Sequence, residues 1–193
     1  MRYNNTMNRL GHISEIHTGY NFRSIANTTC QTVYLVSAKD LSTNFTDIDE
    51  IDIPGSYRNY LKDGDILVKS RGVSYEAKVF KSPNHSHPYI AANTLIIVRL
   101  TTDDYKPSYI TQLINSNGTQ QFLRSLSSGQ TVPILAPSSL GSLNCPKFPL
   151  EKQGKLETIA ETLDEYQITL AKYAEAGEQL TKALKTKLMK GVL

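Results

Sequence analysis

The sequence predicts a mixed α/β (α+β) fold: one globular domain of short strands and short helices, followed by a long coiled-coil-like C-terminal helix. Two observations support this prediction. Residues 1–150 contain short β-branched and aromatic runs that are separated by Gly, Pro, Asn and Asp. Residues 151–190 contain no proline and carry apolar side chains at alternating steps of three and four, which is the spacing of one helical seam. We therefore expect a domain over residues 1–150 and a helix within residues 151–193.

The composition narrows the possible classes of protein. The formal net charge of +3 belongs to residues 1–150, which hold 14 Lys/Arg against 11 Asp/Glu, an excess compatible with nucleic-acid binding. Cys30 and Cys145 lie far apart without a CxxC partner, so neither a disulfide framework nor a zinc finger is predicted. Signal-peptide and membrane-span patterns are absent from the sequence, so we expect a cytoplasmic protein that binds no membrane.

The first third of the domain contains three apolar segments. Leu10–Ile16 is short and apolar, and we expect a strand or a turn of helix there. Val33–Val36 is a compact β-branched and aromatic run, which favours a buried strand. Residues 42–56 are polar and acidic around three isoleucines, so we expect a surface excursion or an edge strand.

A hairpin-like pair of strands is expected next. The Asp-Gly turn at residues 62–65 leads into a strand at Ile66–Val68, which delivers the polar residues Lys69–Gly72 at its far end. The alternating segment Glu76–Lys81 fits the returning strand.

The rest of the domain contains one strong strand signal and two short helices. Asn93–Leu100 is a continuous apolar run, which is typical of a strand buried on both faces. Helices are expected over Tyr109–Ile114, which follows a proline, and over residues 119–127. A last extended piece, Leu143–Pro149, leads into the long helix.

Four stretches in this order resemble the target-recognition half of a type I restriction-modification specificity subunit. They are Gly19–Arg23, Gly64–Gly72, Gly129–Pro133 and Phe148–Gln153, the last followed by Ile159, Ala160 and Leu163. Each stretch is common by itself. Their order and spacing are specific, and the resemblance covers nearly the whole chain.

The resemblance implies a non-catalytic subunit that binds double-stranded DNA sequence-specifically. Such a subunit presents its target to DNA methyltransferase subunits and sometimes to a restriction subunit. Family members normally carry two halves in one polypeptide, with two helices packed antiparallel as a ruler between the recognition domains. This chain corresponds to one half, so it is either a short half-subunit that dimerises or a fragment. No cofactor and no metal site is predicted.

Long polar side chains on loops and strand ends are the candidates for DNA contacts, because they can reach base edges or phosphates. The best group stands at a strand end beside Gly72, where a rigid element holds the side chains. A solvated strand end is the competing interpretation. The predicted DNA-binding residues are Arg23, Lys69, Ser70, Arg71, Lys78, Lys81, Gln130 and Thr131.

The long helix carries a dimerisation seam and a reversal of charge. Residues 151–171 hold five acidic residues and two lysines, whereas residues 172–193 hold five lysines and two glutamates. Antiparallel pairing of two copies sets acidic halves beside basic halves, so we predict a homodimer that reads a bipartite site; complementing the helix dipole is the alternative. The seam residues are Leu156, Ile159, Leu163, Tyr166, Leu170, Tyr173, Gly177, Leu180 and Leu184. Gly177 either permits close approach of a neighbour or marks a bend.

Two other functions remain open at this point. Asp65 with Glu76-Ala77-Lys78 fits the loose acid and Glu-x-Lys spacing of Mg²⁺-dependent nucleases, in which carboxylates hold the metal. Asp65 is more simply the residue that ends a turn. The second alternative is an assembly subunit that uses its helix and does not bind DNA.

Overall fold

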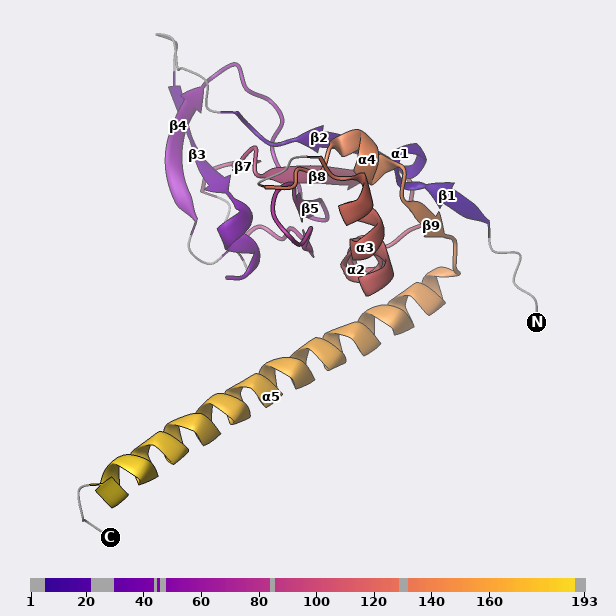
Figure 1. Ribbon diagram of the computed structural model, residues 1–193. Coiled ribbons are helices and arrows are strands. Elements are labelled where there is room, and N and C mark those ends of the chain that lie inside the picture. Colours follow the sequence, from indigo (N-terminus) through magenta and orange to yellow (C-terminus); the bar gives the residue numbers. More distant parts are fainter. Residues whose placement is uncertain are drawn as a thin grey trace. The chain divides into compact units, whose positions relative to one another are not determined.

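The computed structural model describes residues 6–21, 30–43, 45, 48–83, 86–128 and 132–189 (Figure 1). The chain divides into two compact units, Met1–Gln153 and Gly154–Leu193. Arg23, Gln130 and Thr131, three of the predicted DNA-binding residues, lie outside the described residues. Within the described ranges, every helix falls short of the length or the hydrophobicity that a membrane crossing requires.

Strand β8 (Leu95–Leu100) lies inside a four-stranded sheet of order β2-β8-β5-β6. Its neighbours β2 (Ser14–Thr18) and β5 (Ile66–Lys69) both run antiparallel to it, and β6 (Ala77–Val79) pairs antiparallel with β5. The expected hairpin-like pair is therefore confirmed as β5 and β6.

The prediction that the Asn93–Leu100 run is buried on both faces is also confirmed. Ile96 and Val98 belong to one core cluster, whereas Leu95 and Ile97 belong to a second. Alternate side chains point to opposite faces of a strand, so β8 needs apolar residues at consecutive positions to serve both cores. This requirement explains why the run lacks the alternation of a half-exposed strand.

A second sheet has the order β4-β3-β7 and packs near the second core. β3 (Cys30–Val36) pairs antiparallel with β4 (Asp49–Pro54), which is the expected edge strand within residues 42–56. β3 also pairs in parallel with β7 (Tyr89–Ala91). The sequence did not predict β7, because its three residues are too few to show a period.

Short elements close the domain around the first core. β1 (Met7–Arg9) pairs with β9 (Asn144–Pro146), so the two ends of the domain meet. The segment expected as a strand or helical turn is both: α1 (Leu10–Ile13) continues directly into β2. The remaining elements are η1 (Ala38–Leu41), α2 (Pro107–Asn115), α3 (Asn117–Leu126) and α4 (Pro137–Gly141).

Helix α5 (Leu150–Met189) confirms the predicted long helix. Its first turn is tied to the domain by Gln153, which is fully buried. The Gln153 amide accepts a hydrogen bond from the Lys106 backbone (2.8 Å) and donates to the carbonyls of Asp104 (2.8 Å) and Phe148 (2.7 Å). A buried amide with three partners fixes the point at which the helix leaves the domain.

Candidate nucleic-acid interface

The site begins where β5 ends at Lys69. Gly72 has a φ of +112°, a left-handed conformation that glycine adopts without strain, and it turns the chain away from the sheet. Ser70 is buried, and its backbone donates to the Thr94 carbonyl and accepts from Leu135, both at 2.9 Å. Its hydroxyl lies 3.3 Å from the Asn93 carbonyl. Ser70 therefore anchors the turn, and Arg71 is the exposed side chain that it presents.

Ser128 and residues 133–135 lie against this strand end. Ser128 and Ile134 exchange two backbone hydrogen bonds, of 3.1 and 2.7 Å. Ile134 also forms a β-bridge with Arg71, and the Gly72 backbone donates to Pro133 at 3.0 Å. Residues 70–72 are thus joined to residues 133–135, segments about sixty residues apart in the chain, whereas Gln130 and Thr131 lie outside the described residues. No motif in the sequence indicated this juxtaposition.

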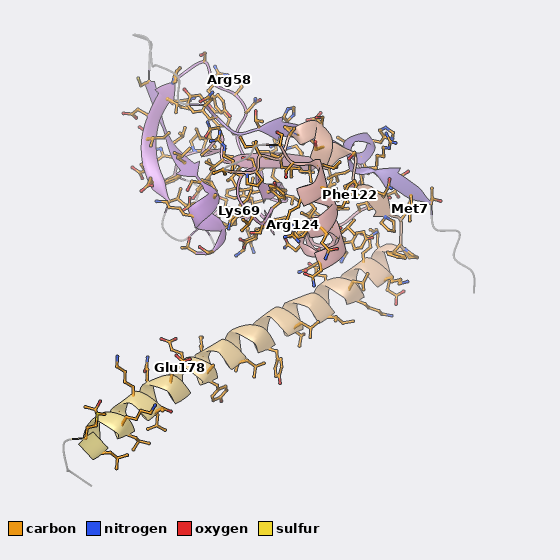
Figure 2. All side chains as sticks on the ribbon, in the orientation of Figure 1. Met7, Arg58, Lys69, Phe122, Arg124 and Glu178 are labelled. Atoms are coloured by element: carbon orange, nitrogen blue, oxygen red, sulfur yellow. The ribbon has the colours of Figure 1, made fainter. Side chains whose placement is uncertain are left out.

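Helix α3 adds a second cation to the same region. Arg124 is exposed, and its guanidinium Nη1 donates to the Val73 carbonyl at 3.2 Å. Arg124 is labelled in Figure 2, and this hydrogen bond establishes that α3 adjoins the segment after β5. We name the exposed set Arg71, Val73, Arg124, Val132 and Ile134 the strand-end surface.

The strand-end surface combines positive charge with apolar area. Val73 is 79% exposed, Val132 50% and Ile134 43%. Residues 66–75 and 105–150 contain no Asp or Glu, and the adjacent Glu76 is paired with Lys69. Exposed cations suit a phosphate backbone, and exposed aliphatic groups suit sugars and thymine methyls.

Two side-chain amides hold the loop that follows β5. The Gln120 amide accepts from the Tyr75 backbone (2.9 Å) and donates to the carbonyls of Tyr75 (3.0 Å) and Ile114 (2.9 Å). The Asn115 amide likewise accepts from Ala77 (2.8 Å) and donates to the Ala77 carbonyl (2.9 Å). These amides take the place of a further strand at the β6 edge. Sequence reasoning missed both, because an amide in a helix carries no local sign of a partner about forty residues away.

The other predicted DNA-binding lysines have different surroundings. Lys69 is half-buried and forms an ion pair with Glu76 at 2.5 Å. Lys78 donates to the Leu41 carbonyl at 2.8 Å and lies over the Phe45 ring, and burial lowers the pKa of its ammonium. Lys81 is exposed. Their roles in DNA binding stay predictions.

The carboxylates of the nuclease alternative do not converge. Asp65 is buried and accepts two hydrogen bonds from the Arg99 guanidinium, of 2.7 and 2.6 Å. Asp65 pairs in the ladder with Phe80, whereas Glu76 stands opposite Lys69 at the other end of β5. Four strand residues separate these ends by about 13 Å. No group of three or more His, Cys, Asp or Glu able to hold a metal ion occurs in the described part of the chain.

The predicted dimerisation seam is an exposed apolar stripe on α5. Its eight apolar side chains range from 37% exposed at Leu156 to 73% exposed at Tyr173. At Gly177 an added Cβ would meet no atom within 4 Å. An apolar stripe of this length on a single chain marks an interaction surface.

Comparisons with known proteins identify the fold. No family model matches the chain, and no curated protein does. One match is a solved structure that describes complex assembly and conformational transition of the type I R-M system. Its TM-score is 0.67 and its identity 16%, over 100% of this chain and 47% of that chain. The HsdS subunit from Thermoanaerobacter tengcongensis matches with a TM-score of 0.63 and 16% identity, over 98% and 50%.

A third match is the type I restriction-modification S subunit from M. genitalium, with a TM-score of 0.54 and 14% identity, over 97% of this chain and 47% of that chain. The chain thus spans about half the length of the structures that it matches. At these identities the matches establish the fold, and they confirm at that level the resemblance seen in the sequence. The chain has the fold of one half of a type I restriction-modification S subunit.

Proposed function

We propose that this chain is a DNA-specificity half-subunit of a type I restriction-modification system. It binds duplex DNA at a defined sequence through the strand-end surface, and two copies pair through α5 to read a bipartite site. The observation that carries the proposal is the correspondence of the whole chain, domain and helix together, to about half of the matched S subunits. The role is non-catalytic, and methylation or cleavage belongs to partner subunits.

The surface chemistry supports DNA as the ligand. Arg71 and Arg124 are exposed cations that suit a phosphate backbone, and the carboxylate of the neighbouring Glu76 is paired with Lys69. Gln130 and Thr131, which lie outside the described residues, have side chains of the kind that reads base edges. The Gln120 and Asn115 amides hold the neighbouring loop, which reduces the entropy lost on binding.

The test is selection of duplex DNA from a random library by the purified protein, followed by affinity measurements at several salt concentrations. Enrichment of a defined sequence, with affinity that falls steeply as salt rises, is the expected result. Arg71→Ala/Arg124→Ala should weaken binding to the selected duplex by about a hundredfold, if each cation contributes roughly tenfold.

The matched control is Arg9→Ala/Lys62→Ala, which removes the same charge from two exposed residues outside the strand-end surface. It should change affinity far less. Equal losses of DNA affinity in the two double variants would show that the strand-end surface contributes only nonspecific electrostatic attraction. No salt-dependent binding to any duplex would favour the assembly subunit that does not touch DNA.

A further inference from the structure

The seam of α5 has an internal symmetry. Two antiparallel copies related by a twofold axis bring together residues that lie at equal distances on either side of that axis. If the axis passes between Ala171 and Lys172, seam residues face seam residues from Ile159 to Leu184, and Leu156 faces Lys187. The facing pairs are Leu170 with Tyr173, Tyr166 with Gly177, Leu163 with Leu180 and Ile159 with Leu184.

Side-chain size supports this register. The largest seam residue on one side of the axis, Tyr166, faces Gly177, which has no side chain. A Cβ added at Gly177 would meet no atom within 4 Å, so the seam has open space at this position. A tyrosine ring can pack over such a gap.

This register pairs residues 154–189 of α5 over their full length. The flanks of the seam are small, with Thr162, Thr169, Ala176 and Ala183 in sequence, which permits the close approach of two helices.

Charge fixes the direction of the pair. The sign of the net charge changes between residues 171 and 172, from an excess of three acidic residues before that point to an excess of three lysines after it. Most of these charges stand on the outer faces of the helix, away from the seam positions. They favour antiparallel pairing because the acidic half of one helix then attracts the basic half of the other. The sizes of the facing seam side chains then select the register.

Shifts by one heptad lose part of these matches. One shift sets Leu163 against Tyr173 and places Gly177 opposite Ile159, so no tyrosine faces the glycine. The opposite shift sets Tyr173 against Gly177, but it pairs only six seam residues and places Leu163 opposite Lys187. Both shifts also move the axis away from the charge reversal.

We propose that two copies of this chain pair antiparallel about a twofold axis between Ala171 and Lys172, with Tyr166 of each copy packed on Gly177 of the other. This inference rests on the homodimer of the proposed function and specifies its geometry. The two helix starts at Leu150 then lie about 65 Å apart along the axis, because their levels differ by 43 residue steps of about 1.5 Å.

Site-specific cross-linking of the full chain tests the register. Two differently tagged versions are co-expressed in a Cys30→Ser background, one carrying Leu163→Cys and the other Leu180→Cys. Cys145 stays, because it is buried and burial raises the pKa of its thiol to about 12. Mild oxidation, or a short bis-maleimide, should link the two tagged chains in high yield.

Two pairings of variants control for the alternatives. Leu163→Cys combined with Tyr173→Cys should not link, and its linking would indicate the heptad-shifted register. Leu163→Cys in both copies should not link either, because the two positions lie about 25 Å apart in the proposed pair. Linking of that combination would indicate parallel helices.

The mass of the unmodified protein in solution tests the homodimer separately from its register. Light scattering that gives a monomer overturns the homodimer, and the register with it. A dimer in which Leu163→Cys and Leu180→Cys do not link overturns the register and leaves the homodimer standing. A dimer with that link alone supports both.

A packing test gives an independent readout. Gly177→Leu should weaken dimerisation roughly tenfold by overfilling the gap that Tyr166 occupies, and Tyr166→Ala in the same chain should restore it. Residues 166 and 177 of one chain are about 16 Å apart and do not touch, so this rescue requires contact between copies. Equal effects of Gly177→Leu with and without Tyr166 would contradict the register.

Discussion

Gln120 forms a closed pair of hydrogen bonds with the backbone of Tyr75: the Tyr75 N–H donates to Oε1 at 2.9 Å, and Nε2 donates to the Tyr75 carbonyl at 3.0 Å. The Gln120 side chain and the Tyr75 ring are buried. The pair joins α3 to the loop between Arg71 and β6. Together with the hydrogen bond from Arg124 to the Val73 carbonyl, the pair helps to set the positions of Arg71 and Arg124 relative to each other.

Gln120→Ala should lower the free energy of unfolding by about 2 to 3 kcal/mol, because it leaves buried backbone groups of Tyr75 and Ile114 without partners. Urea denaturation with an unchanged m-value measures the effect. Gln121→Ala changes an exposed neighbour on the same helix and should stay within about 0.5 kcal/mol. Similar losses for the two variants would show that the amide pair contributes little.

The ion pair of Asp65 and Arg99 predicts a structural role for Asp65. Asp65→Ala should cost about 3 kcal/mol, because Arg99 loses its bidentate partner and the Lys62 backbone N–H loses its acceptor. Asp63→Ala is the matched control, since Asp63 accepts one exposed backbone bond from Ser82, and it should cost about 1 kcal/mol.

The same arrangement bears on the nuclease alternative. Neither the unmodified protein nor Glu76→Gln should cleave duplex DNA in the presence of Mg²⁺, because Glu76 and Asp65 stand at opposite ends of the β5–β6 ladder. The measurement is incubation of both proteins with duplex DNA and Mg²⁺. Cleavage by the unmodified protein that disappears in Glu76→Gln would restore the alternative.

Cys145 and Tyr109 predict a loss of stability at alkaline pH. Burial raises the pKa of the Cys145 thiol from 9.0 to about 12, and that of Tyr109 from 10.0 to about 12. Above pH 9 the unfolded chain releases these protons while the folded chain retains them. The free energy of unfolding should therefore fall as pH rises from about 9 to 12.

Cys145→Ala removes one of these groups, so its stability should fall less steeply than that of the unmodified protein over the same range. Chemical denaturation at pH 8, 9.5 and 10.5 measures the difference. Cys30→Ala, at an exposed cysteine, should keep the unmodified slope. Parallel curves for Cys145→Ala and the unmodified protein would contradict the prediction.

Substitutions of the predicted DNA-binding lysines should have different effects, because the lysines have different surroundings. Lys81→Ala removes an exposed cation and should lower the salt slope of DNA binding by up to about one unit. Lys78→Met should act mainly on stability, by about 1 kcal/mol, because its ammonium binds the Leu41 carbonyl. Parallel titrations of DNA affinity against salt and of unfolding against urea distinguish the two results.

The sequence by itself determined the elements whose signals are local. The run of apolar residues predicts β8, and the Asp-Gly turn with the alternating segment after it predicts β5 and β6. The helical spacing of apolar residues and the absence of proline predict the forty-residue helix. The symmetry of the seam around residues 171 and 172 is also a property of the sequence, because helix geometry maps position directly onto a face.

Only the tertiary structure decided which distant residues meet. The short strands β1, β7 and β9 have too few residues for a period, and they exist because partners from other parts of the chain supply their hydrogen bonds. Arg71 meets Ile134, and Gln120 meets Tyr75, through pairings that no local pattern encodes. The strand-end surface therefore depends on long-range packing, whereas the long helix can be predicted from the sequence.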